Sequence, residues 1–258
     1  MSKELKKDLL TVKIYQNRAE MGAAAADDIA DKIREILGRK EEINMIFAAA
    51  PSQNEMLDSL TSEQGIDWNR VNAFHMDEYL GLPAEAPQGF GNFLKERLFH
   101  KLNFRSVNYL DGQSSDPEAE CRRYASLLAR HPADIVCLGV GENGHVAFND
   151  PPVADFQDPR LVKPVRLDPV CRNQQVHDGC FQKLEDVPTQ ALTLTVPALF
   201  RGRYLFCVVP ASTKAKAVRR MLEGPIEEAC PASVLRRHAH AVLYLDPESS
   251  SLLDTEAE

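Results

Sequence analysis

A histidine and a carboxylate lie five residues apart in the segment GVGENGHVAFNDPP, residues 139–152, which directly follows an apolar run. Histidine titrates near neutral pH, and a nearby carboxylate can orient its ring and stabilise its protonated form. We therefore predict that His145 and Asp150 move protons on a bound molecule, and that Gly141 lets the backbone approach that molecule closely. The alternative is a polar loop with a surface histidine. The position directly after an apolar strand favours the site.

Two adjacent carboxylates, Asp77 and Glu78, follow a second apolar run in FHMDEYLGL, residues 74–82. A carboxylate at the carboxyl end of a strand can act as a general base on a bound substrate. The alternative is a helix cap or a solvated acidic pair, and the spacing alone does not choose between the two.

Two further stretches after apolar runs indicate phosphate binding. In PASTKAKAV, Lys214 lies in the first turn of a predicted helix, where free N–H groups and the helix dipole attract anions. Lys216 of the same turn is expected to face solvent. In AAAPSQNEM, Ser52 stands at a junction between strand and helix that also suits a phosphate. An ordinary helix start is the alternative at both places, and for Ser52 it is the better explanation from the sequence alone.

Apolar runs of strand length alternate with helix-length segments along nearly the whole chain, and these elements must position the four stretches. Strands are predicted at residues 10–15, 43–50, 70–76, 106–110, 133–140, 203–210 and 240–246. Helices are predicted at residues 18–37, 55–64, 90–102, 117–130 and 212–224. This alternation predicts an α/β fold of modified Rossmann-like type, with a single doubly wound, mostly parallel sheet and helices on both faces. We predict one domain over residues 1–258, with its site beyond the carboxyl ends of the strands.

Composition limits the classes of function. The chain has 258 residues, 44% of them apolar, enough for one large core, and its net charge of -8 argues against nucleic-acid binding. No apolar run approaches the roughly 18 residues that span a bilayer, and the first residues lack the apolar part of a secretory signal. We therefore expect a cytoplasmic protein with no membrane partner. The six cysteines form no C-x-x-C pair and are expected to be reduced thiols with no metal site.

Together the four stretches resemble the glucosamine-6-phosphate deaminase/isomerase family, which is related to the 6-phosphogluconolactonases. FHMDEYLGLP resembles the family's F-N-M-D-E-Y-x-G-L-P, and GVGENGHVAFNDP resembles its G-x-G-x-D-G-H-I-A-F-N-E-P. VPTQALTLTVPAL and STKAKAV resemble two further family segments, so the likeness runs in order through most of the chain. The lactonases share the G-x-D-G-H core but continue differently after it.

The resemblance implies a cofactor-free conversion of glucosamine 6-phosphate, or a close epimer, to a ketose 6-phosphate and ammonia. The sugar ring opens, a proton moves from C2 to C1, and ammonia leaves when the resulting imine is hydrolysed. By the same resemblance, Asp77 is the base that moves the C2 proton, His145 is the acid–base group that opens the ring, and Asp150 supports it. Lys214 and Arg172 match phosphate-binding residues, Arg172 by a looser alignment.

Ser52, Gly141 and Glu78 complete the expected substrate-binding set. Asn143, counted with the catalytic residues, stands where the family has an aspartate, which removes a negative charge beside the histidine. Asp150 is shorter than the family's glutamate. These departures leave the substrate open, so isomerisation of a non-amino sugar phosphate, lactone hydrolysis and non-catalytic phosphosugar sensing are kept as alternatives. A small-molecule sugar phosphate is the expected partner, and assembly into a homo-oligomer stays open.

Overall fold

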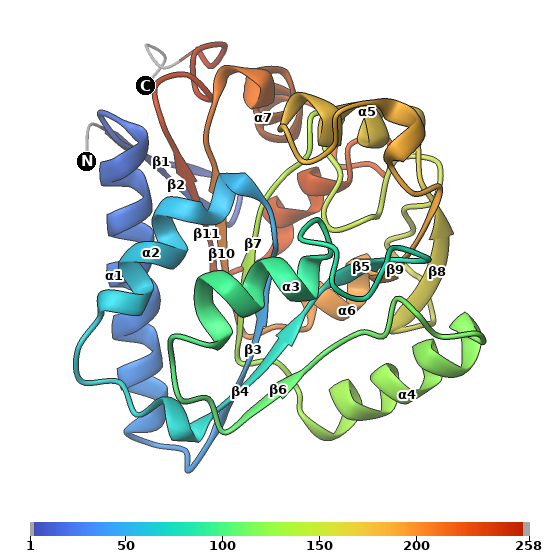
Figure 1. Cartoon of the computed structure of the whole chain (residues 1–258). Coiled ribbons are helices and arrows are strands. Elements are labelled where there is room, and N and C mark those ends of the chain that lie inside the picture. The colour runs from blue at the N-terminus through green and yellow to red at the C-terminus, as the bar shows by residue number, and fades with distance from the viewer. Residues whose placement is uncertain (1–2, 255–258) are drawn as a thin grey trace.

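The computed structural model describes residues 3–254, which form two β-sheets and the helices packed on them (Figure 1). The strands are β1 (Lys3–Lys7), β2 (Leu10–Ile14), β3 (Ile43–Phe47), β4 (Val71–His75), β5 (Asp77–Tyr79), β6 (Ser106–Asn108), β7 (Ile135–Leu138), β8 (Val162–Arg166), β9 (Gln190–Leu194), β10 (Tyr204–Val209) and β11 (Ala241–Leu245). The α-helices are α1 (Arg18–Leu37), α2 (Asn54–Ser62), α3 (Phe90–Leu94), α4 (Pro117–Arg130), α5 (Pro169–His177), α6 (Val196–Phe200) and α7 (Ala215–Glu223). Shorter 3-10 turns are η1 (Pro51–Gln53), η2 (Trp68–Arg70), η4 (Leu184–Asp186), η5 (Ser212–Lys214) and η6 (Pro231–Arg237), and η3 (Lys95–Phe99) is a π-helical turn.

The larger sheet has eight strands in the order β1-β2-β11-β10-β7-β3-β4-β6. All neighbours pair in parallel except β1, which pairs antiparallel with β2 at one edge. Each of the predicted apolar runs forms one strand of this sheet. The predicted α/β class with a mostly parallel, doubly wound sheet is therefore confirmed.

Side chains of the central strands alternate between two apolar cores, one on each face of this sheet. In β7, Ile135 and Cys137 belong to the core that contains residues of α1, α2 and α3, whereas Val136 and Leu138 belong to the core that contains residues of α4, α6 and α7. Successive side chains of a strand point to opposite faces, so a strand that is apolar throughout must be covered on both sides. Each large aliphatic side chain buried in this way stabilises the fold by about 1.5–3 kcal/mol.

Most helices lie where the sequence pattern predicts them. Both α1 and α4 have the predicted bounds, and the Asn17 side chain caps α1 by accepting a hydrogen bond of 2.8 Å from the N–H of Glu20. The start of α7 differs from the prediction, because a 3-10 turn precedes the helix and the helix itself begins at Ala215. Lys214 therefore lies just before the first turn of the helix instead of within it.

A second sheet of three antiparallel strands, in the order β5-β9-β8, was not predicted from the sequence. It lies at the side of the molecule, on the right in Figure 1. Only Met76 separates β5 from β4, so the chain leaves the larger sheet there and Asp77 pairs with Thr193 of β9. Asp77 therefore lies at the boundary between the two sheets.

All six cysteines are free, and Cys137 and Cys207 are buried in β7 and β10. The expectation of reduced thiols is consistent with this arrangement. Within residues 3–254, no helix combines the length and the apolar composition needed to cross a membrane.

Candidate active site

A cleft lies at the carboxyl ends of β10, β7, β3 and β4, which are neighbours in the larger sheet. We call it the strand-end cleft; its volume is about 500 Å³, including the part open to solvent. The order of strands along the chain reverses between β7 and β3, and ligands of open α/β sheets bind beside such a reversal. Of the residues predicted for the site, the cleft is lined by Ser52, Asp77, Gly141, His145 and Lys214.

The His145 ring is held through one of its two nitrogens. Nδ1 lies 2.8 Å from Oδ1 of Asn143 and 2.9 Å from Oδ1 of Asp150. Both oxygens accept hydrogen bonds, so we assign the proton to Nδ1, which donates it to them. Nε2 is then the basic nitrogen, and among residues 3–254 no group hydrogen-bonds to it. Because the ring lines the cleft, Nε2 is the nitrogen that can exchange a proton with a ligand.

Gly141 packs directly against the His145 ring. A Cβ at position 141 would lie 2.0 Å from Cε1, 2.2 Å from Nε2 and 2.4 Å from Nδ1 of that ring. The N–H of Gly141 donates to the carbonyl of His145 at 2.9 Å, which closes the turn. Only glycine leaves room for the ring in this position, a role that the sequence did not indicate.

Asp150 is buried, with 1% of its surface exposed, and Asn143 links it to the histidine. The Asn143 amide donates from Nδ2 to Oδ1 of Asp150 at 2.9 Å, while its own Oδ1 accepts from the N–H of His145 at 3.0 Å. Burial raises the pKa of Asp150, but the His145 charge and the hydrogen bonds from His145 and Asn143 outweigh it and hold the pKa below its usual value. An ionised aspartate at position 143 would have no donor for Asp150. The asparagine at position 143 therefore matches the aspartate at position 150, because it donates a hydrogen bond to that carboxylate.

Cys171, in the first turn of α5, lies beside this pair. One donor atom from each of His145, Asp150 and Cys171 lies within 4.8 Å of the other two. Burial raises the pKa of the Cys171 thiol well above its usual value, and the negative charge of Asp150 raises it further. The sequence predicts only a reduced thiol at this position, because no local spacing relates Cys171 to the histidine loop.

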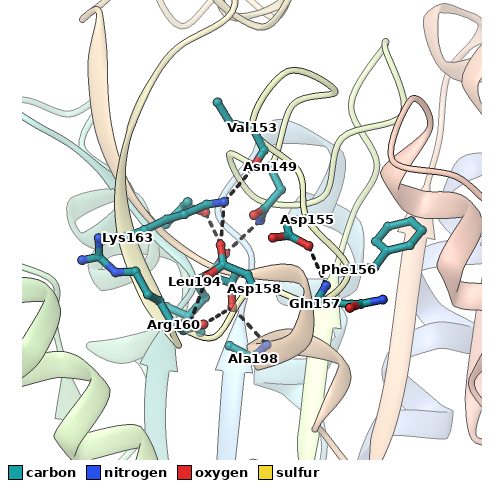
Figure 2. Close-up of polar contacts among 12 residues, drawn as sticks. Asn149, Val153, Asp155, Phe156, Gln157, Asp158, Arg160, Lys163, Leu194 and Ala198 are labelled. Carbon is teal, nitrogen blue, oxygen red and sulfur yellow. Dashed lines mark hydrogen bonds and ion pairs between the residues drawn. The ribbon is translucent and has the colours of Figure 1, made fainter.

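The loop that follows Asp150 is tied to the smaller sheet by the contacts that Figure 2 shows. The fully buried Asn149 donates from Nδ2 to the carbonyl of Leu194 at 2.8 Å. Lys163 donates to the carbonyl of Val153 at 2.6 Å and to the carboxylate of Asp158 at 2.8 Å. The loop is thus attached to β9 at its start and to β8 further along. Asp150 lies between these two attachments in the chain, so they hold it in place.

Asp77 begins β5 and presents a buried carboxyl group to the cleft, with 7% of the residue exposed. Within the part of the chain that the structure describes, this carboxylate accepts no hydrogen bond. Burial raises the pKa of Asp77 well above its usual value, and the neighbouring charge of Glu78 raises it further. A carboxylate with a raised pKa is a stronger base than an ordinary aspartate, which suits removal of a proton from carbon.

The backbone beside Asp77 is fixed by His75, which is fully buried at the end of β4. Nδ1 of His75 donates to the carbonyl of Asp77 at 2.9 Å, and Nε2 accepts from the N–H of Leu110 at 3.0 Å. Burial lowers the pKa of His75 to about 4, so its ring is neutral at physiological pH. His75 is a positioning residue that the sequence analysis missed, because a histidine within an apolar strand carries no signal that separates it from core.

Lys214 is 4% exposed and lines the strand-end cleft, in the η5 turn that follows β10. No hydrogen bond or ion pair reaches its ammonium group from residues 3–254. Burial lowers the pKa of Lys214, against the opposing influence of the Asp178 and Glu142 charges. A buried cation without a direct partner destabilises the fold, and an anion that enters the cleft removes that penalty. Lys216 is exposed, as the sequence predicts.

Ser52 lies in η1, next to a buried glutamine that the sequence analysis did not select. Gln53 donates from Nε2 to Oγ of Ser52 at 3.1 Å and to the carbonyl of Val208 at 3.1 Å. Its Oε1 is buried without a hydrogen-bond partner in the described part of the chain. Gln174 and Gln175 of α5 line the same cleft and were also missed, because their approach depends on how α5 packs.

Four of the predicted residues do not line the strand-end cleft: Asn143 and Asp150, which contact His145, and Glu78 and Arg172, which lie elsewhere. Glu78 accepts hydrogen bonds of 2.8–3.0 Å from three backbone N–H groups, two of them at the start of α3. Arg172 donates to two carbonyls of the loop at residues 184–187, at 2.7 and 2.8 Å. Glu78 therefore connects β5 to α3, and Arg172 holds a loop beside α5. Their roles in substrate binding stay predictions.

Comparison with known proteins gives one consistent result. The family model described as glucosamine-6-phosphate isomerases/6-phosphogluconolactonase matches residues 16–244. Glucosamine-6-phosphate deaminases of Bacillus thuringiensis (strain Al Hakam) and Bacillus anthracis (strain CDC 684 / NRRL 3495) are each 35% identical over 245 residues, which cover 95% of this chain and 88% of the relative.

Two solved structures have the same fold. A monomeric glucosamine-6-phosphate deaminase superposes with a TM-score of 0.85 at 28% identity and covers 94% of this chain and 99% of its own. A 6-phosphogluconolactonase from Thermotoga maritima superposes with a TM-score of 0.76 at 21% identity and covers 92% of this chain and 99% of its own. At that identity, the second likeness concerns the fold alone.

Proposed function

The chain belongs to the glucosamine-6-phosphate isomerase/6-phosphogluconolactonase family, and we propose that it is an aminosugar-phosphate deaminase. It converts glucosamine 6-phosphate, or a close epimer, to a ketose 6-phosphate and ammonia. The observation that carries this proposal is the meeting of Asp77, His145 and Lys214 in one cleft, from the ends of different strands. A base, an acid–base group and a cation are the three groups that this reaction needs from the protein.

Ring opening is assigned to His145. Nε2 takes the proton of the C1 hydroxyl and returns a proton to the ring oxygen, so one group must act as base and then as acid. The contacts of Nδ1 with Asn143 and Asp150 hold the ring in the tautomer that leaves Nε2 basic, and they stabilise the imidazolium that forms in between.

Proton transfer between carbons is assigned to Asp77. Its carboxylate removes the C2 proton of the open-chain sugar and returns it to C1, while a proton also passes from the amine nitrogen to O1, and the C2 amine thereby becomes an imine. Water adds to the imine carbon, and ammonia leaves as the C2 carbonyl forms. The aldose is oxidised at C2 and reduced at C1 within one molecule, so the balance requires no redox cofactor.

The phosphate group is assigned to Lys214 and the η1 turn. Lys214, which follows β10, supplies a buried ammonium with no ion-pair partner within residues 3–254, and Ser52, which follows β3, supplies a hydroxyl to the same cleft. Binding energy from the phosphate orients the reacting carbons against Asp77 and His145. We infer further that residues 1–258 act as one sugar-phosphate domain, since the cleft draws on elements from β3 to η5.

A screen of hexosamine phosphates tests this proposal. Wild-type protein is incubated with glucosamine 6-phosphate and its epimers, and ammonia and ketose phosphate are measured together. We expect equal amounts of both products from at least one substrate, and loss of both in Asp77→Asn. Asp58→Asn, an exposed carboxylate of α2, is the matched control that should retain activity. Ketose or acid formed without ammonia would support isomerisation of a non-amino sugar or lactone hydrolysis instead.

A further inference from the structure

His145, Asp150 and Cys171 form a compact cluster that the deamination reaction does not account for in full. Each of the three residues is buried, and one donor atom from each lies within 4.8 Å of the other two. The reaction uses His145 and Asp150 but assigns nothing to Cys171. In addition, Oδ2 of Asp150 is buried and receives no hydrogen bond of ordinary geometry within residues 3–254; the Cys171 thiol, a weak donor, is near this carboxylate. A buried carboxylate oxygen without a strong donor is an acceptor that a cation can satisfy.

The donor set suits one class of cation. A thiolate sulfur, an imidazole nitrogen and a carboxylate oxygen are the three ligand types that Zn²⁺ takes in proteins. Hard cations such as Mg²⁺ select oxygen ligands and would leave the sulfur and nitrogen unused. The cluster therefore favours a borderline-soft divalent ion over the common hard ones.

The geometry requires little movement. Zn²⁺ bonds of about 2.0–2.3 Å in a tetrahedron place neighbouring donors about 3.3–3.8 Å apart. Nδ1 of His145 and Oδ1 of Asp150 are 2.9 Å apart, and the remaining separations do not exceed 4.8 Å. The distances between the donor atoms therefore need to change by about 1 Å or less to reach the tetrahedral values, which side-chain rotations can supply.

Charge and access also agree with a zinc site. One Zn²⁺ bound to one thiolate, one carboxylate and one neutral imidazole gives no net charge, which a buried site tolerates best. On binding, the Cys171 proton leaves to solvent, and the imidazole proton moves from Nδ1 to Nε2, which frees the Nδ1 lone pair for the ion. His145 lines the strand-end cleft, whereas Asp150 and Cys171 do not, so the ion reaches the cluster from the cleft by displacing the His145 ring.

We propose that His145, Asp150 and Cys171 bind one Zn²⁺ ion, and that this ion reversibly inhibits the enzyme. The inhibitory part rests on the proposed function, because the ion takes the Nδ1 lone pair and the carboxylate that orient His145 for ring opening. The fourth position is left to water. Cys171 is the member of the cluster that makes the site specific to zinc.

Calorimetric titration of the metal-free full-length protein with ZnCl₂ tests the site without any reference to activity. We expect one ion per chain in wild type and in Cys180→Ser, which alters a thiol that lies after α5 and outside the cluster. In Cys171→Ser the affinity should fall at least about 100-fold. Mg²⁺ should bind to neither wild type nor either variant in the same titration. Co²⁺ bound to wild type should show thiolate-to-metal charge-transfer absorption, which Cys171→Ser should lack. Cys171→Ala serves as the second variant if Cys171→Ser does not fold.

Inhibition is measured separately, as the ratio of ammonia release with and without Zn²⁺ for each protein. Zn²⁺ should slow ammonia release by wild type and by Cys180→Ser, and addition of a chelator such as EDTA should restore their activity. Cys171→Ser should keep its activity at the same zinc concentration. Absence of a bound ion in wild type, or equal affinity in Cys171→Ser, would overturn the site. Zinc that binds through Cys171 without slowing the reaction would overturn the inhibition. If the protein releases no ammonia from any substrate, the titration still decides whether the site exists.

Discussion

Among single residues, the cleft combines one side chain that is hydrogen-bonded by its neighbours with two charged side chains that are not. His145 has its Nδ1 held by Asn143 and Asp150, whereas neither the Asp77 carboxylate nor the Lys214 ammonium has a hydrogen-bond partner within residues 3–254. A buried charge without a partner costs free energy that a correctly placed ligand recovers. The arrangement is therefore that of a site in which the substrate supplies the missing partners.

Replacing Lys214 by methionine tests the phosphate contact. The change keeps the length of the side chain and removes a charged hydrogen bond, which contributes about 1.5–3 kcal/mol. We expect kcat/KM for glucosamine 6-phosphate to fall roughly 10- to 150-fold, mainly through a higher KM. A non-reactive sugar 6-phosphate should raise the melting temperature of wild type but not that of Lys214→Met.

Lys216→Met is the matched control for this change, because Lys216 is exposed two residues further along. It should retain the wild-type KM and the ligand-induced rise in melting temperature. A wild-type KM in Lys214→Met would contradict the assignment of the phosphate to this lysine.

The residues that the sequence predicted best are those whose meeting depends on topology alone. Asp77, His145 and Lys214 each follow an apolar run, and parallel strands bring their carboxyl ends to one edge of the sheet. Contacts that depend on packing were not predictable in the same way. The position of Cys171 beside Asp150 depends on how α5 lies over the histidine loop, which no local pattern encodes.

Among the elements, the loop after β7 is the one on which the proposed chemistry depends most. Gly141 does not have a left-handed backbone conformation, so replacing it with alanine introduces no backbone strain of that kind. The new Cβ would instead lie 2.0 Å from Cε1 of His145 and force the ring to move. Displacement of a catalytic group by about 1 Å costs on the order of 100-fold in rate.

We therefore expect Gly141→Ala to lower kcat by about 100-fold while the protein still folds, as followed by steady-state kinetics and circular dichroism. Gly38→Ala, at the end of α1, is the control: its Cβ would meet nothing nearer than 3.3 Å, and kcat should not change. A wild-type kcat in Gly141→Ala would show that the ring position is not required for ring opening.

The elements themselves were predicted unevenly, for physical reasons. Long amphipathic helices such as α1 and α4 repeat their signal over several turns and have clear caps, so their bounds agree with the pattern. The strands β5, β8 and β9 pair with one another instead of joining the larger sheet. Their pairing is set by contacts between distant segments, and three-residue β5 is too short to show a period.

In the whole molecule, the buried Asp77 should make stability depend on pH. Its pKa is raised in the folded state, so the folded chain keeps a proton that the unfolded chain releases as the pH rises above the ordinary value for aspartate. Stability is therefore lost between the ordinary pKa and the raised one, and the deficit persists at higher pH. Asp77→Asn removes this titration and keeps the shape of the side chain.

We expect Asp77→Asn to be more stable than wild type at pH 7–8 by about 1–3 kcal/mol, although it has no activity. Each kcal/mol raises the melting temperature of a domain of this size by about 2–4 °C. The gain should shrink as the pH falls toward the ordinary pKa of aspartate, as thermal unfolding across that range would measure. Asp58→Asn, which alters an exposed carboxylate, should show neither the gain nor its pH dependence. Equal melting temperatures for wild type and Asp77→Asn at every pH would contradict the raised pKa.

The central claim is that Asp77 takes the C2 proton of an aminosugar phosphate, and proton NMR of the C2 hydrogen tests it most directly. Wild type, Asp77→Asn and Asp58→Asn are each incubated with glucosamine 6-phosphate, and the C2 signal is followed together with ammonia. The account predicts that wild type and Asp58→Asn lose the signal as ammonia appears, and that Asp77→Asn loses it about 10²–10⁴-fold more slowly. Loss of the C2 hydrogen at the wild-type rate in Asp77→Asn would contradict the account.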